Sequence, residues 1–204
     1  MARPRIMVLY YSMFGNTFKM AKAISEGIEA SGCEAVLMTV PELVPDKVIQ
    51  TNPVMKRAKD EQKDVPIAAI DELSGIDGII LGSPTRFGNM CSQLRNFLDQ
   101  TGPLWMKGAL VDKPAGVFCC TASLHGGQET TLISMMLTLI HHGAIMVGVP
   151  YSVRELATTT FGGTPYGPTA VVGETSSNPP TATDLKIASE LGKRVAKVAK
   201  KLSA

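Results

Sequence analysis

Side chains that could hold a phosphate group cluster in a short loop near the start of the chain. An apolar and aromatic run at residues 6–11 is followed by the loop Ser12-Met13-Phe14-Gly15-Asn16-Thr17. Apolar residues at helical spacing begin directly after the loop. A buried strand, a tight loop and a helix, in that order, direct backbone N–H groups and the positive end of the helix at one point. Because Ser12, Asn16 and Thr17 add side-chain donors, this pattern predicts a phosphate site.

The kind of phosphate follows from what this loop lacks. The loop matches neither the Walker pattern GxxxxGK[ST] nor the dinucleotide pattern GxGxxG. Gly15 is its one glycine, and it has no lysine. These features favour a terminal monophosphate, such as that of FMN in a doubly wound sheet, over a pyrophosphate. The alternative is an ordinary strand–helix connection in which Ser12 only caps the helix.

A second polar loop follows another short apolar run, at residues 78–82. It reads Ser83-Pro84-Thr85-Arg86-Phe87-Gly88-Asn89-Met90. A loop of this kind can lie along the edge of a flat ring and offer backbone N–H groups to its heteroatoms. In that interpretation Phe87 packs near the ring and Asn89 hydrogen-bonds to it. The alternative is a solvent loop in which Arg86 forms a surface ion pair and Phe87 is buried.

The third polar loop, residues 121–127, contains two glycines, two hydroxyl groups and His125. Gly126 and Gly127 permit close approach of the backbone to a ligand. The other two histidines, at 141 and 142, end the following helical pattern, where a histidine often serves as a favourable charge at a helix C-terminus. Trp105 is the sole tryptophan, and an indole there suits either a packed surface anchor or the wall of a substrate pocket.

Alternating strand and helix patterns position these loops. Strands are predicted at 5–11, 34–40, 78–82, 115–120 and 145–149, with helices at 15–31, 94–102, 130–142 and 183–202. Near-continuous apolar strands alternating with helices predict an α/β fold: a doubly wound, five-stranded parallel sheet of order 2-1-3-4-5, with helices on both faces. Ligands of such sheets bind at the carboxyl ends of the strands, where all three loops lie. We expect a single domain over residues 1–204, with a polar, partly helical surface excursion at about 41–66 and a long loop at about 150–180.

Composition excludes several other classes of protein. The chain has 204 residues and a net charge of +2, so there is no reason to expect nucleic acid as a partner. No window approaches the ~18 uninterrupted apolar residues of a membrane span. The N-terminal segment runs directly into the first strand, so we expect no signal peptide and a cytoplasmic protein. The four cysteines lack CxxC spacing, and three histidines are too few for a metal site without carboxylates, so we expect no metal.

Several longer motifs occur in order along nearly the whole chain. They are LYYS at 9–12, GSPTRFGNM at 82–90, FLDQTG at 97–102, LW at 104–105, TASLHGGQE at 121–129, HHG at 141–143 and GGTPYG at 162–167. Together these motifs resemble the WrbA-type family of NAD(P)H:quinone oxidoreductases, within the flavodoxin-like superfamily. The resemblance implies FMN as cofactor, NADH or NADPH as electron donor, two-electron reduction of quinones, and a homotetramer built as a dimer of dimers.

The resemblance also implies roles for individual residues. The phosphate would be held by Ser12, Met13, Phe14, Gly15, Asn16 and Thr17. The isoalloxazine would be lined by Pro84, Thr85, Arg86, Phe87, Gly88 and Asn89, and flanked on its other side by Cys120, Thr121, Ala122, Ser123, Leu124, His125 and Gly126. The catalytic residue His141 would reach the flavin from a neighbouring subunit, as a proton donor or a hydrogen-bond donor to the quinone. The substrate-binding residues would be Phe14 and Trp105.

Two departures from the family pattern stand out. Phe14 occupies a position where members often carry Tyr, near the nicotinamide, so this chain keeps the aromatic face and loses a hydroxyl. Cys119-Cys120 stands where Ser or Thr is common. Two other functions remain open at this level: a one-electron carrier, which the near-neutral charge disfavours because it gives no charged docking surface, and a DNA-binding regulator, for which no basic stripe or recognition helix is present.

Overall fold

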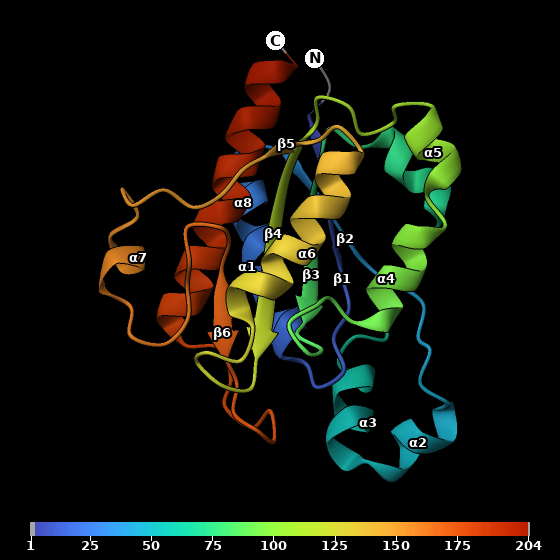
Figure 1. Ribbon diagram of the computed structural model, residues 1–204, viewed down its shortest axis with the longest axis vertical. Coiled ribbons are helices and arrows are strands. Elements are labelled where there is room, and N and C mark those ends of the chain that lie inside the picture. The colour runs from blue at the N-terminus through green and yellow to red at the C-terminus, as the bar shows by residue number, and fades with distance from the viewer. Residues whose placement is uncertain (1–2, 204) are drawn as a thin grey trace.

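The computed structural model describes residues 3–203, which form a parallel sheet with helices on both faces (Figure 1). The strands are β1 (Arg5–Tyr10), β2 (Glu34–Thr39), β3 (Gly78–Pro84), β4 (Pro114–Thr121), β5 (Ile145–Met146) and β6 (Thr169–Val171). The main order is β2-β1-β3-β4-β5, and every pairing is parallel. The predicted five-stranded order is therefore confirmed, and β6 is an additional strand.

The helices pack on the sheet in two layers. The structure contains α1 (Asn16–Ala30), α2 (Asp46–Thr51), α3 (Pro53–Asp60), the 3₁₀ helix η1 (Ile70–Gly75), α4 (Ser92–Asp99), α5 (Gly102–Met106), α6 (Gln128–His141), α7 (Arg154–Thr158) and α8 (Ala182–Leu202). One apolar cluster joins α1 and α8 to one face of the sheet, and a second joins α4 and α6 to the other. Figure 1 shows α6 (gold) crossing the sheet on the side opposite α1 (blue) and α8 (red).

The two clusters follow from the alternation of side chains along each strand. On β1, Ile6 and Val8 pack towards α1 and α8, whereas Met7 and Leu9 pack towards α4 and α6. Successive side chains of a strand point to opposite faces, so a strand that is apolar throughout must be covered on both. The apolar runs in the sequence therefore predicted the two-layer cover correctly.

The edge of the sheet next to β4 departs from the prediction. The strand expected at 145–149 is paired over two residues only, with Pro114 and Ala115. The end of β4 is paired instead with β6, which lies inside the loop expected at 150–180, and Cys119 faces Thr169 across this pairing. That loop also contains α7. The surface excursion at 41–66 is partly helical, as expected, and its helices α2 and α3 lie beyond the carboxyl end of the sheet (Figure 1).

None of the helices within residues 3–203 is long and apolar enough to cross a membrane.

Candidate functional site

The three polar loops meet in one pocket at the carboxyl ends of β1, β3 and β4. The pocket has a volume of about 230 Å³. It is lined by Ser12, Met13, Phe14, Asn16, Thr17, Pro84, Thr85, Arg86, Cys120, Thr121, Ala122, Val172, Glu174 and Ser176. Parallel topology predicted that these loops converge, and the structure confirms it.

The first loop presents polar groups that its own chain leaves unsatisfied. The side chain of Ser12 is 1% exposed, and no group within residues 3–203 hydrogen-bonds to its Oγ. Gly15 adopts the left-handed region at φ 87°, which allows α1 to begin immediately at Asn16. The first N–H groups of a helix have no partners within the helix, so they are available to an anion at this point.

The second loop is a tight turn with its aromatic side chain in solvent. The backbones of Arg86 and Asn89 hydrogen-bond to each other at 2.8 and 3.0 Å. Between them Phe87 and Gly88 take φ values of 52° and 79°, the pattern of a turn with two left-handed residues. Phe87 is fully exposed at the tip and does not line the pocket. It is therefore neither buried nor in contact with the pocket of its own chain.

Thr85, at the base of this turn, is held firmly. Its backbone N–H donates to the carbonyl of Cys120 at 2.9 Å, and the hydroxyl of Thr131 donates to its Oγ1 at 2.7 Å. These bonds connect the second loop to β4 and to α6. The wall formed by residues 84–86 is therefore fixed by neighbouring secondary structure.

The third loop contributes only its first residues to the lining. The Thr121 hydroxyl donates to the carbonyl of Ser123 at 2.8 Å, and the N–H of Gly126 donates to the same carbonyl at 3.1 Å. This turn leaves four of the expected residues outside the lining: Ser123, Leu124, His125 and Gly126. Burial raises the pKa of Cys120 to about 12, so the thiol that lines the pocket is neutral at physiological pH.

A fourth segment of the pocket wall was missed by sequence analysis. Val172, Glu174 and Ser176 line the pocket because β6 pairs with the end of β4 and brings the chain past the first loop. The side-chain amide of Asn16 donates to the carbonyl of Ser176 at 2.8 Å, which joins this segment to the start of α1. The signal available in the sequence was the short run Thr169-Ala170-Val171 after Pro168. Three residues are too few to predict a strand.

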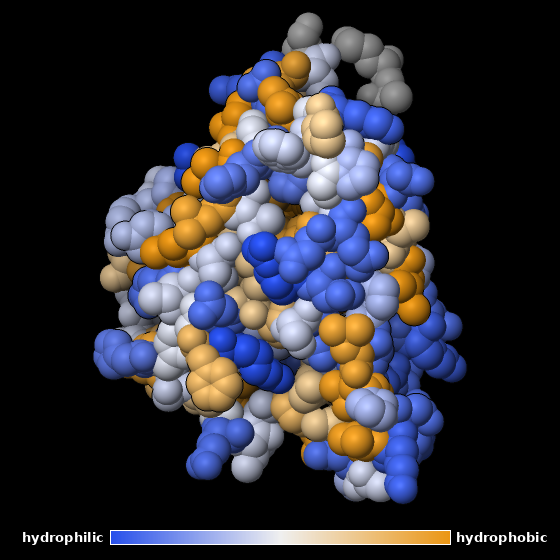
Figure 2. All heavy atoms as spheres, turned by 45° about the vertical axis from the view of Figure 1, so that its right-hand side comes forward, coloured by the Kyte–Doolittle hydropathy of each residue, from blue (hydrophilic) through white to orange (hydrophobic). Residues whose placement is uncertain are grey.

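His141 and Trp105 lie in a different hollow, a groove of about 780 Å³. The turn of the second loop separates the two: Thr85 and Arg86 line the pocket, whereas Asn89 and Met90 line the groove. Figure 2 shows the face that carries α4, α5 and α6, where hydrophobic residues (orange) are interspersed with hydrophilic ones (blue). The structure therefore does not bring His141 and Trp105 into the pocket of their own chain.

The second histidine of the pair is buried. His142 is 7% exposed, and its Nε2 lies 2.9 Å from Oγ1 of Thr101. The Thr101 hydroxyl donates to the carbonyl of Leu98 at 2.6 Å, so its oxygen must accept from an Nε2–H of His142. Burial, together with the neighbouring His141, lowers the pKa of His142.

The pocket fits the phosphate of FMN. The unpaired Ser12 hydroxyl, the buried Thr17 and the start of α1 supply donors, and residues from the ends of β3 and β4 complete the lining. Over residues 3–203, no group of three or more His, Cys, Asp or Glu side chains could hold a metal ion.

Comparisons with known proteins agree with this geometry. The family described as NADPH-dependent FMN reductase matches residues 4–159. The chain is 45% identical to an NAD(P)H dehydrogenase (quinone) of Aromatoleum aromaticum over 201 residues, 97% of both chains. It is also 45% identical to one of Trichlorobacter lovleyi, over 98% of this chain and 99% of the other. A WrbA-like flavodoxin from Agrobacterium tumefaciens superimposes with a TM-score of 0.66 at 26% identity, over 97% and 98% of the two chains. The resemblance inferred from the motifs is confirmed: the chain belongs to the NADPH-dependent FMN reductase family, together with the NAD(P)H dehydrogenases (quinone).

Proposed function

We propose that this protein is an FMN-dependent NAD(P)H:quinone oxidoreductase that reduces quinones to hydroquinones. Relatives at 45% identity over almost the whole chain are named for that activity. The observation that carries the proposal is the Ser12 hydroxyl, which is buried beside the start of α1 and finds no hydrogen-bond acceptor or donor within residues 3–203. A bound phosphate would satisfy it.

The loops then have separate tasks. Residues 12–17 bind the phosphate through the Ser12 and Thr17 hydroxyls and the backbone N–H groups at the start of α1. Pro84, Thr85 and Arg86, which line the pocket, would face the flavin ring on one side. Cys120, Thr121 and Ala122, from the third loop, would flank its other side. FMN held by these residues would supply the redox chemistry, namely hydride transfer from NAD(P)H to flavin N5 and two-electron reduction of a quinone in ping-pong order.

His141 would act in a site shared between copies of the chain. Because His141 and Trp105 lie across the second loop from the pocket, they would reach a flavin only in a neighbouring subunit. An interface between copies of the chain, which a homotetramer requires, is supported by an exposed apolar stripe on α6, formed by Ile133, Leu137 and Ile140 at helical spacing. In this assembly His141 donates a proton or a hydrogen bond to the quinone oxygen, and Trp105 and Phe14 wall the substrate.

An anaerobic absorbance experiment tests the activity. The purified protein is loaded with FMN, then treated with NADH or NADPH, and then with benzoquinone. Bleaching of the flavin band by the nicotinamide and its recovery with quinone are the expected results. Flavin binding without bleaching would indicate a one-electron carrier, and absence of flavin binding would contradict the pocket assignment.

The assembly is tested separately by light scattering on the same sample. The mass expected is four times that of the 21.7 kDa chain. Substitution of Leu137 by Glu, in the centre of the α6 stripe, should lower the mass and the quinone reductase activity together. A monomer that retains full activity would contradict the shared site.

A further inference from the structure

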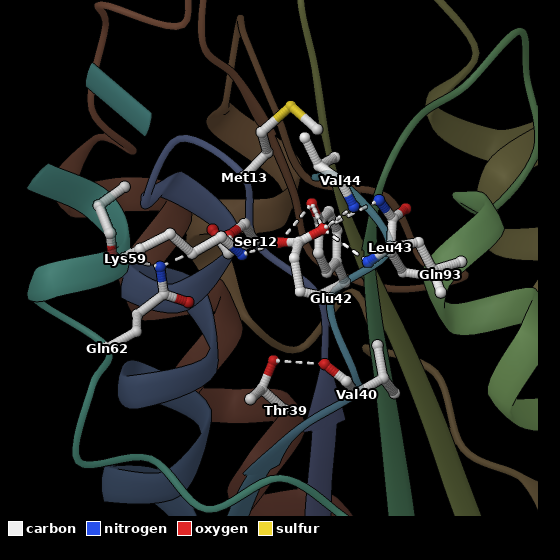
Figure 3. A network of polar contacts seen from close by, with 12 residues as sticks. Ser12, Met13, Thr39, Val40, Glu42, Leu43, Val44, Lys59, Gln62 and Gln93 are labelled. Carbon is white, nitrogen blue, oxygen red and sulfur yellow. Dashed lines mark hydrogen bonds and ion pairs between the residues drawn. The ribbon is translucent and has the colours of Figure 1, made fainter. Parts of the chain in front are cut away.

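A half-buried carboxylate close to the phosphate loop joins three parts of the fold: the segment after β2, the end of β1 and α3. Glu42, in the segment after β2, accepts hydrogen bonds at 2.9 Å from the N–H groups of Leu43 and Val44. It also accepts from the hydroxyl of Tyr11 at 2.9 Å, and the ammonium of Lys59 lies 2.5 Å from its Oε2. Figure 3 shows Leu43, Val44 and Lys59 around the Glu42 carboxylate. The multiple donors lower the pKa of Glu42 despite partial burial, so it is ionised at neutral pH.

The same cluster reaches the phosphate loop through one carbonyl. Lys59 Nζ donates to the backbone oxygen of Ser12 at 3.2 Å, and Gln62 Nε2 donates to the same oxygen at 3.4 Å (Figure 3). Gln62 is itself fixed, because its amide also donates to the carbonyl of Ala58 and its oxygen accepts from the hydroxyl of Tyr10 at 3.0 Å. Two side chains from α3 and the turn after it therefore hold the first peptide of the loop.

The orientation of that peptide decides where its N–H points. The structure has no cis peptide bonds within residues 3–203, and a trans peptide places its C=O and N–H on opposite sides. Because the carbonyl of Ser12 faces Lys59 and Gln62, the N–H of Met13 is turned away from them. Ser12 and Met13 both line the pocket, so rotation of this peptide would change the donors that the loop presents.

The helix α3 also lies near the far end of the loop. A Cβ placed on Gly15 would lie 3.6 Å from the Cβ of Ala58. The excursion thus contacts the loop at Ser12 and lies close to it at Gly15. A loop that is held before its ligand arrives spends less binding free energy on ordering, and this gain appears as affinity.

We propose that Lys59, positioned by Glu42 and assisted by Gln62, is a positioning residue that holds the phosphate loop in its binding conformation. The inference rests on the proposed function, because it assumes that the loop binds the phosphate of FMN. Lys59 acts through geometry, since Glu42 balances its charge. The surface excursion at 41–66 is therefore a structural part of the cofactor site.

Comparison of FMN with riboflavin, which lacks the phosphate, isolates the role of the loop. Dissociation constants of both flavins are measured by fluorescence quenching with the apoprotein, for the wild type and for Lys59→Met. We expect the substitution to raise the dissociation constant of FMN about tenfold, which is the effect of losing one hydrogen bond from a charged group. The dissociation constant of riboflavin should change by less than about twofold. Lys56→Met is the matched control, since Lys56 lies on the same helix and pairs with the exposed Asp60. It should change neither constant.

Glu42→Gln separates positioning from simple attraction of charge. If Lys59 only attracted the phosphate, removing the neighbouring negative charge would tighten FMN binding. Positioning requires that Glu42→Gln weaken it, and that the double variant lose less than the product of the two single losses, because both act through one contact.

Amide hydrogen exchange of the apoprotein provides a second measurement that does not depend on binding. Lys59→Met should speed exchange at residues 13–17 while α1 and β1 keep their protection. Unchanged FMN affinity in Lys59→Met, or equal weakening of FMN and riboflavin, would overturn the inference while leaving the enzyme assignment intact. Failure of the wild type to bind FMN would instead overturn the proposed function.

Discussion

The indole Nε1 of Trp105 donates a hydrogen bond of 2.8 Å to the backbone carbonyl of His141. The bond joins α5 to the last turn of α6, where carbonyl groups lack partners within the helix. Trp105 is 55% exposed, so the indole fixes the end of α6 while much of its ring stays open to the groove. The expected substrate-binding residue Trp105 and the expected catalytic residue His141 are therefore mechanically coupled.

Replacing Trp105 with Phe tests this coupling. The ring face is kept and the N–H donor is lost, so the last turn of α6 and His141 become less well fixed. We expect kcat/KM for quinone to fall about threefold to tenfold, the effect of one hydrogen bond. FMN affinity should change less than kcat/KM, because Trp105 is assigned to the wall of the substrate site. Met106→Gln, at the exposed neighbouring position, is the control, and an equal loss of FMN affinity in Trp105→Phe would contradict the assignment.

Replacing Ser12 with Ala should separate stability from cofactor binding. The Ser12 hydroxyl is buried without a partner, so its removal should leave the apoprotein as stable as the wild type or slightly more stable. FMN binding should weaken about tenfold, because a hydrogen bond to a charged phosphate is lost. Thermal unfolding and flavin titration measure the two effects. Lower apoprotein stability with unchanged FMN affinity would show that the hydroxyl serves the fold.

Gly82, in the middle of β3, leaves room for an aromatic ring. A Cβ at this position would overlap the ring of Phe118, the residue on β4 that pairs with Gly82. Gly82→Ala should lower the free energy of unfolding by about 1–3 kcal/mol, as overpacking of a core does. Gly102→Ala is the control, since a Cβ there meets nothing within 4 Å. Chemical denaturation would show whether the two variants differ as expected.

His142 should make stability depend on pH. Burial lowers its pKa in the folded state, whereas the unfolded chain has a pKa of about 6.5. As the pH falls below about 6.5, the unfolded state takes up the proton before the folded state does. The contribution of neutral His142 to the free energy of unfolding is therefore complete above about pH 6.5 and is lost as the pH falls to the pKa of His142 in the folded state. We therefore expect the denaturant concentration at the unfolding midpoint to decrease as the pH is lowered from about 7 to about 5. His142→Asn should show a shallower slope, and equal slopes would exclude this imidazole as the cause.

The adjacent cysteines at the end of β4 should be inert in the native protein. Cys119 and Cys120 point to opposite faces of the sheet, because Cys120 packs in the cluster of α1 and Cys119 in that of α6. Burial raises the pKa of Cys120 to about 12, and it raises that of Cys119 as well. Iodoacetamide at neutral pH should label neither residue until denaturant is added, as read by mass spectrometry. Rapid labelling of the native protein would contradict this.

The sequence predicted the sheet order and the convergence of three loops because both depend on local patterns. Runs of apolar residues mark buried strands, and parallel topology then requires that the loops after Tyr10, Pro84 and Thr121 meet at one edge. What sequence could not supply was pairing between distant segments. Thr169 to Val171 form a strand because β5 pairs only with the start of β4 and leaves its carboxyl end open. Three residues do not encode that pairing by themselves.

Side-chain exposure within the loops was also beyond the sequence. Phe87 was a candidate for packing on a ring, and its position at the tip of a left-handed turn places it in solvent. His141 and His142 are adjacent and alike in type, and the helix turns the first outwards and the second onto Thr101. Lys59 appeared to be one charge among many in a polar stretch, since its contact with the Ser12 carbonyl spans 47 positions.

The division of one sheet edge between β5 and β6 has a consequence for solubility. A long, regular edge strand exposes a row of N–H and C=O groups on which strands of other molecules can grow. Here that edge consists of a two-residue and a three-residue piece, separated by a segment that folds away around α7. Neither piece offers a template long enough to recruit a foreign strand, so the arrangement that completes the pocket wall also guards this edge against aggregation.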